Sequence, residues 1–104
     1  MNHESPFHIF HITDRSTWLT AKKGILYQGD TLPKEGFIHC CFFEQIDGVL
    51  DTWFKGKDDL VIVEVDPGKL MSLIKYENLE GGTENFPHVY GPIDMDAVIN
   101  EKFI

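Results

Sequence analysis

The sequence predicts a single α+β domain over residues 7–104, in which a small, split, mixed β-sheet packs against two main short helices. A chain of 104 residues, 42% of them hydrophobic, is long enough for one domain and can form a core without disulfides. Segments with strand and helix patterns do not alternate regularly, as they do in doubly wound parallel folds, and this favours the α+β class. Residues 1–6 are polar and are expected to be frayed.

The first elements are a strand and a helix. Phe7–Thr13 is rich in Phe, Ile and His and contains no breaker, which is typical of a strand. Asp14 or Ser16 can cap a following helix that runs to about Lys23 and stops at the next glycine. Within this helix, Trp18 and an alanine three residues later would face the sheet.

Apolar spacing and turn residues predict the remaining elements. Phe43 to about Lys55 has the apolar spacing of a helix, and Gly56 ends it. Further strands are expected at Ile25–Tyr27, Phe37–Cys41, Leu60–Asp66, Met71–Tyr76 and Asp96–Phe103. Gly29–Gly36 and Asn78–Phe86 are expected to be loops.

Charge and cysteine content narrow the class of partner and the compartment. The formal net charge of −8, from 17 acidic and 9 basic residues, argues against nucleic acid or a membrane surface as the main partner. A small-molecule ligand, even an anionic one, is still allowed, because backbone amides at a helix start can hold it. The two cysteines, Cys40 and Cys41, are adjacent and seldom pair in that arrangement, so a reducing, cytoplasmic location is expected.

Three histidines, His11, His39 and His88, each lie in a short apolar segment. Burying one unpaired imidazole nitrogen costs on the order of 1–3 kcal/mol. Either each ring is satisfied locally, or the rings gather at one polar pocket. The second interpretation predicts a functional site.

His11 and Thr13 share one face of the first predicted strand, because side chains alternate with a period of two. The pair can therefore point to one ligand, or it can be a solvated pair at the edge of the sheet. His39 shares a face with Phe37 and Cys41, either in a pocket or as a core histidine bonded to a backbone carbonyl.

His88 and Tyr90 lie between Pro87 and Pro92, two residues that restrict the backbone. The stiff segment suits either a pocket wall or a structural corner. Glu64, in an apolar strand, can act as a base if burial raises its pKa, or it can reach solvent at the end of the strand.

Two further chemistries are open. Cys40 or Cys41 can supply a thiolate nucleophile beside His39, or both can be small core residues. Three histidines can also hold zinc with one open position, but their wide spacing matches no metal motif, so no metal ligands are assigned.

Several of these segments resemble a family of small bacterial-type proteins, the domain-of-unknown-function 952 family. The resemblance covers about Ile9 to Val98. It rests on Phe10-His11-Ile12-Thr13, Trp18, Gly36-Phe37-Ile38-His39-Cys40, Glu44-Gln45, Asp59-Leu60-Val61 and Phe86-Pro87-His88-Val89-Tyr90-Gly91-Pro92. Where the family tends to have Ser, Thr and Pro before Glu44, this chain has Cys41, Phe42 and Phe43.

The family is similar to proteins of the ADP-ribosylation fold, a split mixed sheet that cradles NAD. By that resemblance, His11 would donate to a ribose hydroxyl, and the backbone of Ile12 would meet the carboxamide. The usual catalytic glutamate and stacking tyrosine of that superfamily have no match here, and Ile38 falls where the tyrosine often stands. The resemblance therefore implies a fold more directly than an activity.

The favoured hypothesis is a nucleotide pocket, for NAD or an ADP-ribosyl compound, with ADP-ribosyl transfer or glycosidic cleavage as the reaction. Its predicted catalytic residues are His39, His88 and Glu64, and its predicted ligand-binding residues are His11, Thr13, Gly36 and Tyr90. Two alternatives are a hydrolase or lyase that uses the histidines directly, with or without a metal, and a non-enzymatic interaction domain.

Overall fold

The computed structural model describes residues 7–29, 31–79 and 82–104, so the expected fraying of residues 1–6 lies outside it. One three-stranded sheet has the order β1 (Ile9–Asp14), β4 (Leu60–Val65), β8 (Val98–Phe103), and both pairings are antiparallel. β4 is apolar almost throughout because it is the central strand and side chains pack on both of its faces.

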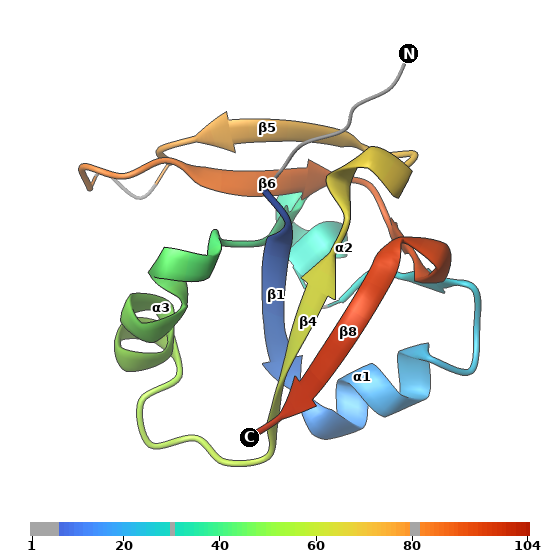
Figure 1. The fold of residues 1–104 in the computed structure, drawn as a ribbon, viewed down its shortest axis with the longest axis horizontal. Coiled ribbons are helices and arrows are strands. Elements are labelled where there is room, and N and C mark those ends of the chain that lie inside the picture. The colour runs from blue at the N-terminus through green and yellow to red at the C-terminus, as the bar shows by residue number, and fades with distance from the viewer. Residues whose placement is uncertain (1–6, 30, 80–81) are drawn as a thin grey trace.

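A second three-stranded sheet has the order β3 (Ile38–His39), β6 (Phe86–Tyr90), β5 (Leu73–Glu77), and it is also antiparallel. In Figure 1, β5 and β6 run nearly crosswise to β1, β4 and β8. A small antiparallel pair, β2 (Leu26–Tyr27) with β7 (Ile93–Asp94), completes the pairings.

The two larger sheets meet at Cys40 and Cys41. The Cys40 amide donates to the Pro87 carbonyl of β6 at 3.0 Å, and Cys41 exchanges two 2.8 Å backbone hydrogen bonds with Phe10 of β1. The chain thus leaves one sheet and joins the edge of the other within two residues, and the predicted division of the sheet is present.

The expectation of a mixed sheet is wrong for the described strands, because every pairing among them is antiparallel. The reason lies in the helical connections, which normally place parallel strands side by side. Here α1 (Arg15–Ala21) connects β1 to β2, and α3 (Ile46–Trp53) connects β3 to β4. Each helix joins strands of different sheets, so neither creates a parallel neighbour.

Two cores lie on the two faces of β1 and β4. The larger contains Ile9 and Val63 with Trp18 of α1, and the smaller contains Ile12 and Leu60 with Ile46 at the start of α3. α1 and α3 accordingly lie on different sides of this sheet (Figure 1). As predicted, Asp14 caps α1, since its carboxylate accepts a 2.9 Å hydrogen bond from the Thr17 amide.

The expected loop Gly29–Gly36 contains a further helix, α2 (Thr31–Glu35). Pro33 lies in its first turn, where the missing N–H needs no partner. Gly36 has a φ of +86° and its amide donates to the Leu32 carbonyl at 2.9 Å, which ends the helix. Pro33 and Gly36 are recognisable in the sequence as signals for the start and the end of a helix. They lie so close together, however, that the helix has little more than one turn.

The stiff segment around His88, for which the sequence allows a pocket wall or a structural corner, is the central strand β6 of its sheet and not a corner. A strand residue directs its N and its C=O to the same side. The Pro87 carbonyl accepts a hydrogen bond from the Cys40 amide, and Cys40 is the first residue after β3. Because the Pro87 nitrogen points to the same side as this carbonyl, its missing N–H lies where β3 has already ended and no strand partner requires it.

Other element boundaries lie close to the predictions. β3 is shorter than the predicted strand Phe37–Cys41, and α3 is extended at its start by the 3-10 turn Phe43–Gln45. Further 3-10 turns cover Pro67–Lys69 and Met95–Ala97. Within the described ranges, no helix is long and apolar enough to cross a membrane.

Candidate functional site

The face of the β3–β6–β5 sheet that carries His39 and His88 is rich in aromatic and polar side chains. His39 and His88 are directly paired across the two strands, and their ring centroids lie 5.3 Å apart. The Phe37 ring lies 4.4 Å from the His88 ring and 5.2 Å from the Tyr90 ring. With Glu35 and Glu77, these four residues form what we call the His39–His88 cluster.

The His88 ring has 0% of its surface exposed and only one of its nitrogens is paired. Nδ1 lies 3.0 Å from a carboxylate oxygen of Glu77. An ionised carboxylate can only accept, so Nδ1 carries a proton and donates it to Glu77, and in the neutral form of the ring Nε2 then presents a lone pair. Nε2 is buried and has no partner among the described residues, an arrangement that costs on the order of 1–3 kcal/mol.

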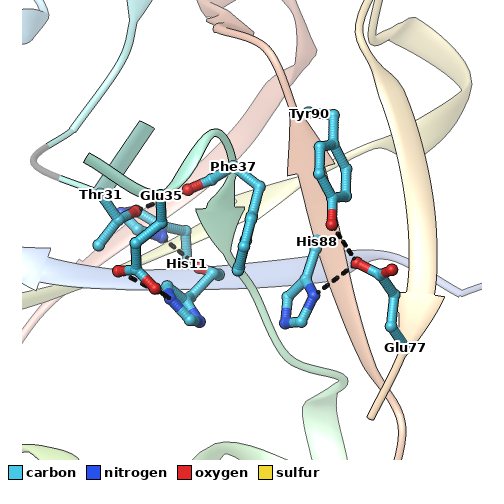
Figure 2. Close-up of polar contacts among 8 residues, drawn as sticks. His11, Thr31, Glu35, Phe37, Glu77, His88 and Tyr90 are labelled. Carbon is cyan, nitrogen blue, oxygen red and sulfur yellow. Dashed lines mark hydrogen bonds and ion pairs between the residues drawn. The ribbon is translucent and has the colours of Figure 1, made fainter. Parts of the chain in front are cut away.

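Glu77 holds this arrangement together (Figure 2). The Tyr90 hydroxyl donates to the same carboxylate oxygen at 2.5 Å. The hydrogen bonds from Tyr90 and His88 lower the pKa of Glu77, and the bond to Glu77 raises the pKa of Tyr90. Glu77 is therefore an ionised acceptor near neutral pH. The Lys75 ammonium lies 4.8 Å from the centre of the Tyr90 ring and adds a positive charge at the edge of the cluster.

His39 is the accessible member of the histidine pair, because 41% of its side chain is exposed. Its Nε2 lies 3.3 Å from Glu35 Oε1, so the last residue of α2 supplies an anionic partner. His39 is therefore not a core histidine, which is the alternative interpretation of its position in the sequence. A carboxylate next to each histidine gives the cluster two acid–base pairs, one exposed and one buried.

His11 lies behind the cluster, and both of its ring nitrogens have hydrogen-bond partners, which is one of the two outcomes that the sequence allows. Its Nδ1 donates to the His39 carbonyl at 2.6 Å, and its Nε2 accepts from the Tyr27 hydroxyl at 2.6 Å. Burial lowers the pKa of His11 to about 4, so the ring is neutral. The alternative of a solvated edge pair is wrong, because His11 and Thr13 are both buried. His11 thus fixes the backbone that carries His39.

Gly36 and Thr13 occupy different surroundings. Gly36 immediately precedes Phe37, and a Cβ atom added to it would meet nothing within 4 Å, so there is open space beside its backbone. Thr13 pairs with Val61 inside the sheet β1–β4–β8. The structure therefore brings His39, His88 and Tyr90 together through Phe37, places Gly36 next to Phe37 in the chain, and leaves Thr13 in the interior.

Glu64 lies away from the cluster. Its carboxylate is 2.6 Å from His8 Nδ1, and it lines a hollow of about 190 Å³ that includes none of the cluster residues. A larger hollow of about 730 Å³, between α3 and the residue Ile104, also excludes the cluster. The carboxylate beside His88 is Glu77 instead.

Sequence reasoning missed Glu77 and Glu35. Glu77 meets His88 across a hairpin whose register is not readable from the sequence, because the connection between β5 and β6 is long. Glu35 is four residues before His39, a spacing that becomes a contact only once α2 is known. Phe37 could be found, since it lies two residues from His39.

Neither cysteine has the properties of a nucleophile. Both are free and buried. Burial raises the pKa of Cys40, and it raises that of Cys41 to about 12. Thiols with such high pKa values are protonated near neutral pH, so Cys40 and Cys41 fit the second interpretation, in which both are small core residues. Among the residues that the structure describes, no group of three or more His, Cys, Asp or Glu side chains is arranged to hold a metal ion.

The sequence from residue 12 to residue 101 matches the model of a family described as "Protein of unknown function (DUF952)", so the chain belongs to the DUF952 family. The crystal structure of protein CC0527 from Caulobacter crescentus is similar, with 32% identity and a TM-score of 0.82 over 92% of this chain and 84% of that one. A solution NMR structure of CC0527 has 32% identity and a TM-score of 0.78, over 91% and 82%. No curated protein matches the chain.

Proposed function

We propose that the His39–His88 cluster binds a nucleotide of the NAD or ADP-ribosyl type and cleaves or transfers at its glycosidic bond, on a fold of the ADP-ribosylation class. The observation that carries the proposal is the unpaired, buried Nε2 of His88 beside an ionised glutamate. Native proteins seldom leave such an atom unpaired, and a ligand group that donates to it would remove the cost. The divided sheet at Cys40 and Cys41 supports the proposed fold class.

The arrangement suits glycosidic chemistry. When the bond between the ribose and its leaving base breaks, the electron pair leaves with the base and positive charge develops on the sugar. Glu77 and Glu35 supply negative charge near that position. In hydrolysis, a water oxygen bonds to the sugar carbon and its proton moves to His88 Nε2, while Glu77 stabilises the resulting imidazolium.

Phe37 and His11 have supporting roles in this proposal. The Phe37 ring covers His88, so the ligand must turn that ring aside and can then stack a planar base on it. His11 holds the His39 backbone from behind. Glu64 has no role here, because it lines a separate hollow that contains no residue of the cluster.

The proposal is tested by titration calorimetry with NAD, ADP-ribose and nicotinamide. Wild type should bind at least one of them, and His39→Ala and Glu77→Gln should each weaken binding by about tenfold, which is the loss of one charge-assisted contact. Asp51→Asn, an exposed substitution on α3, is the matched control for the loss of a carboxylate. Circular dichroism must show that each variant is folded. Absence of heat with all three ligands at millimolar concentration would overturn the proposal.

A second candidate is a hydrolase or lyase for a ligand without a nucleotide. The observation that favours it is the pairing of two histidine–carboxylate dyads across β3 and β6, which is sufficient for general acid–base catalysis. It predicts turnover of a phosphodiester or carboxylic ester that His39→Ala and Glu77→Gln each reduce strongly. If neither turnover nor binding occurs and both His39→Ala and His88→Ala only lower the melting temperature, the cluster belongs to a non-enzymatic interaction domain.

A further inference from the structure

The start of β1 and the 3-10 turn before α3 enclose a hollow that the proposed function does not use. Its volume is about 190 Å³, below the roughly 300–1,000 Å³ of sites for drug-sized ligands, so it suits a headgroup of a few heavy atoms. Its lining consists of aromatic and ionisable side chains: Phe7, His8, Phe10, Phe42, Phe43, Glu44 and Glu64.

The aromatic rings in this hollow are unusually accessible. Phe7 is 66% exposed and Phe43 is 72% exposed, although phenylalanine normally lies inside a domain. The Phe10 and Phe43 rings are 5.8 Å apart at an angle of 57°, so they form two walls of a corner. The π-face of an aromatic ring is negative and attracts a cation that lies against it.

Two carboxylates line the hollow. Glu44 and Glu64 supply carboxylates, and neither lysine nor arginine lines the hollow. Glu64 also holds the His8 ring at 2.6 Å, which fixes the position of its carboxylate. Both the rings and the carboxylates therefore favour a positively charged guest, on a chain whose formal net charge is −8.

The geometry points to a binding site for a small alkylated ammonium ion in this hollow, with the alkyl groups against Phe10 and Phe43 and the charge facing Glu44 and Glu64. An alkylated ammonium fits better than a hydrated metal ion, because the aromatic walls offer no oxygen ligands. No residue that lines this hollow belongs to the His39–His88 cluster, so a test of this cation site is independent of a test of the proposed function.

The test is an NMR titration of the full chain with tetramethylammonium, followed by amide shifts. Saturable shifts at the lining residues are expected, at millimolar affinity. The neutral analogue 2,2-dimethylpropanol, which keeps three methyl groups on a central carbon and is soluble in water, should bind clearly more weakly. Phe43→Leu and Glu64→Gln should each weaken binding about fivefold. Trp53→Leu and Asp51→Asn are matched controls on α3, outside the hollow, and should leave the affinity unchanged.

Three results would overturn the inference. Absence of saturable shifts means that the hollow binds no such cation. Equal binding of the neutral alcohol means that the hollow selects apolar volume and not charge. Shifts that depend on protein concentration and not on ligand mean that the exposed Phe7 and Phe43 contact a second copy of the chain.

Discussion

At the scale of single residues, His11 and His88 show two outcomes of burying an imidazole. His11 has both nitrogens paired, with the His39 carbonyl and the Tyr27 hydroxyl. His88 has one nitrogen paired with Glu77 and the other unpaired. A fully paired ring stabilises the fold, whereas an unpaired buried nitrogen costs stability and suggests a ligand. This difference assigns His11 a structural role and places His88 in the candidate site.

The pH dependence of stability should report the burial of His11. Its pKa is about 4 in the folded protein and 6.5 in the unfolded chain, so the unfolded state binds the extra proton as the pH falls. The stabilising effect is present above pH 6.5 and is lost progressively toward pH 4. Between pH 7.5 and pH 5, His11 should remove about 2 kcal/mol from the unfolding free energy.

Urea unfolding at both pH values measures this change. The variant His11→Gln should show a pH dependence smaller by that amount, because it lacks the group whose pKa is lowered on folding. NMR titration of the His11 ring gives an independent value, and a midpoint near 6.5 in the folded protein would contradict the prediction.

The same residues show what a linear sequence can and cannot reveal. The apolar neighbours of the three histidines predict burial, and His11 and His88 are buried as that pattern indicates. Which nitrogen finds a partner depends on groups far away in the chain, such as Tyr27 for His11 and Glu77 for His88. No local pattern contains those distances, so the pairing could not be predicted.

At the scale of elements, Asp14 decides where α1 begins. Its carboxylate accepts from the Thr17 amide and from the side chains of Ser16 and Thr17, and these bonds lower its pKa to about 2. Asp14→Ala should cost about 1 kcal/mol of stability, while Asp14→Ser should recover most of that loss because serine also caps. Thermal unfolding measures both variants, and an unchanged midpoint in Asp14→Ala would show that the cap is dispensable.

Two glycines should respond in opposite ways to alanine. Gly48 lies inside α3, where an added Cβ meets nothing within 4 Å, so Gly48→Ala should stabilise the protein by about 0.5–1 kcal/mol. Gly91 has a φ of +154°, and its added Cβ would lie 2.9 Å from Ser72 Cβ, so Gly91→Ala should destabilise by about 1–3 kcal/mol. Chemical denaturation compares them, and equal effects would contradict the argument.

The elements that the sequence missed are those whose signals are short or contradictory. Five residues of α2 hold too little apolar periodicity to stand out from a loop. β6 contains a proline, which usually argues against a central strand, and only the end of β3 beside Pro87 makes it tolerable. Long elements with clear periodicity, such as α3 and β4, were predicted within a few residues.

At the scale of the whole molecule, β1 and β4 contribute alternate residues to two cores. Ile9 and Val63 pack in the larger core, and Ile12 and Leu60 pack in the smaller one. Neither core can be lost without exposing a face of this shared sheet. The described domain should therefore unfold as one cooperative unit.

The variant Ile12→Ala tests this coupling. Ile12 is 7% exposed, so truncation should cost about 2–5 kcal/mol. Far-UV circular dichroism and tryptophan fluorescence, both measured in a Trp53→Phe background that leaves Trp18 as the fluorophore, should shift to the same new midpoint, since Trp18 lies in the other core. A fluorescence midpoint that stays at the wild-type value would show that the two cores unfold separately.

Residue patterns alone predicted the α+β class, the two main helices, most of the strands and the family to which the chain belongs, because periodicity, caps and rare motifs are local. The three-dimensional structure was needed to establish that the described strands pair in antiparallel fashion, that His39 meets His88, and that Glu77 rather than Glu64 supplies the nearby carboxylate. Those contacts join residues that are far apart in the chain and lie on neighbouring strands. Their geometry follows from strand register and from the way the two sheets meet at Cys40 and Cys41, which no stretch of sequence specifies alone.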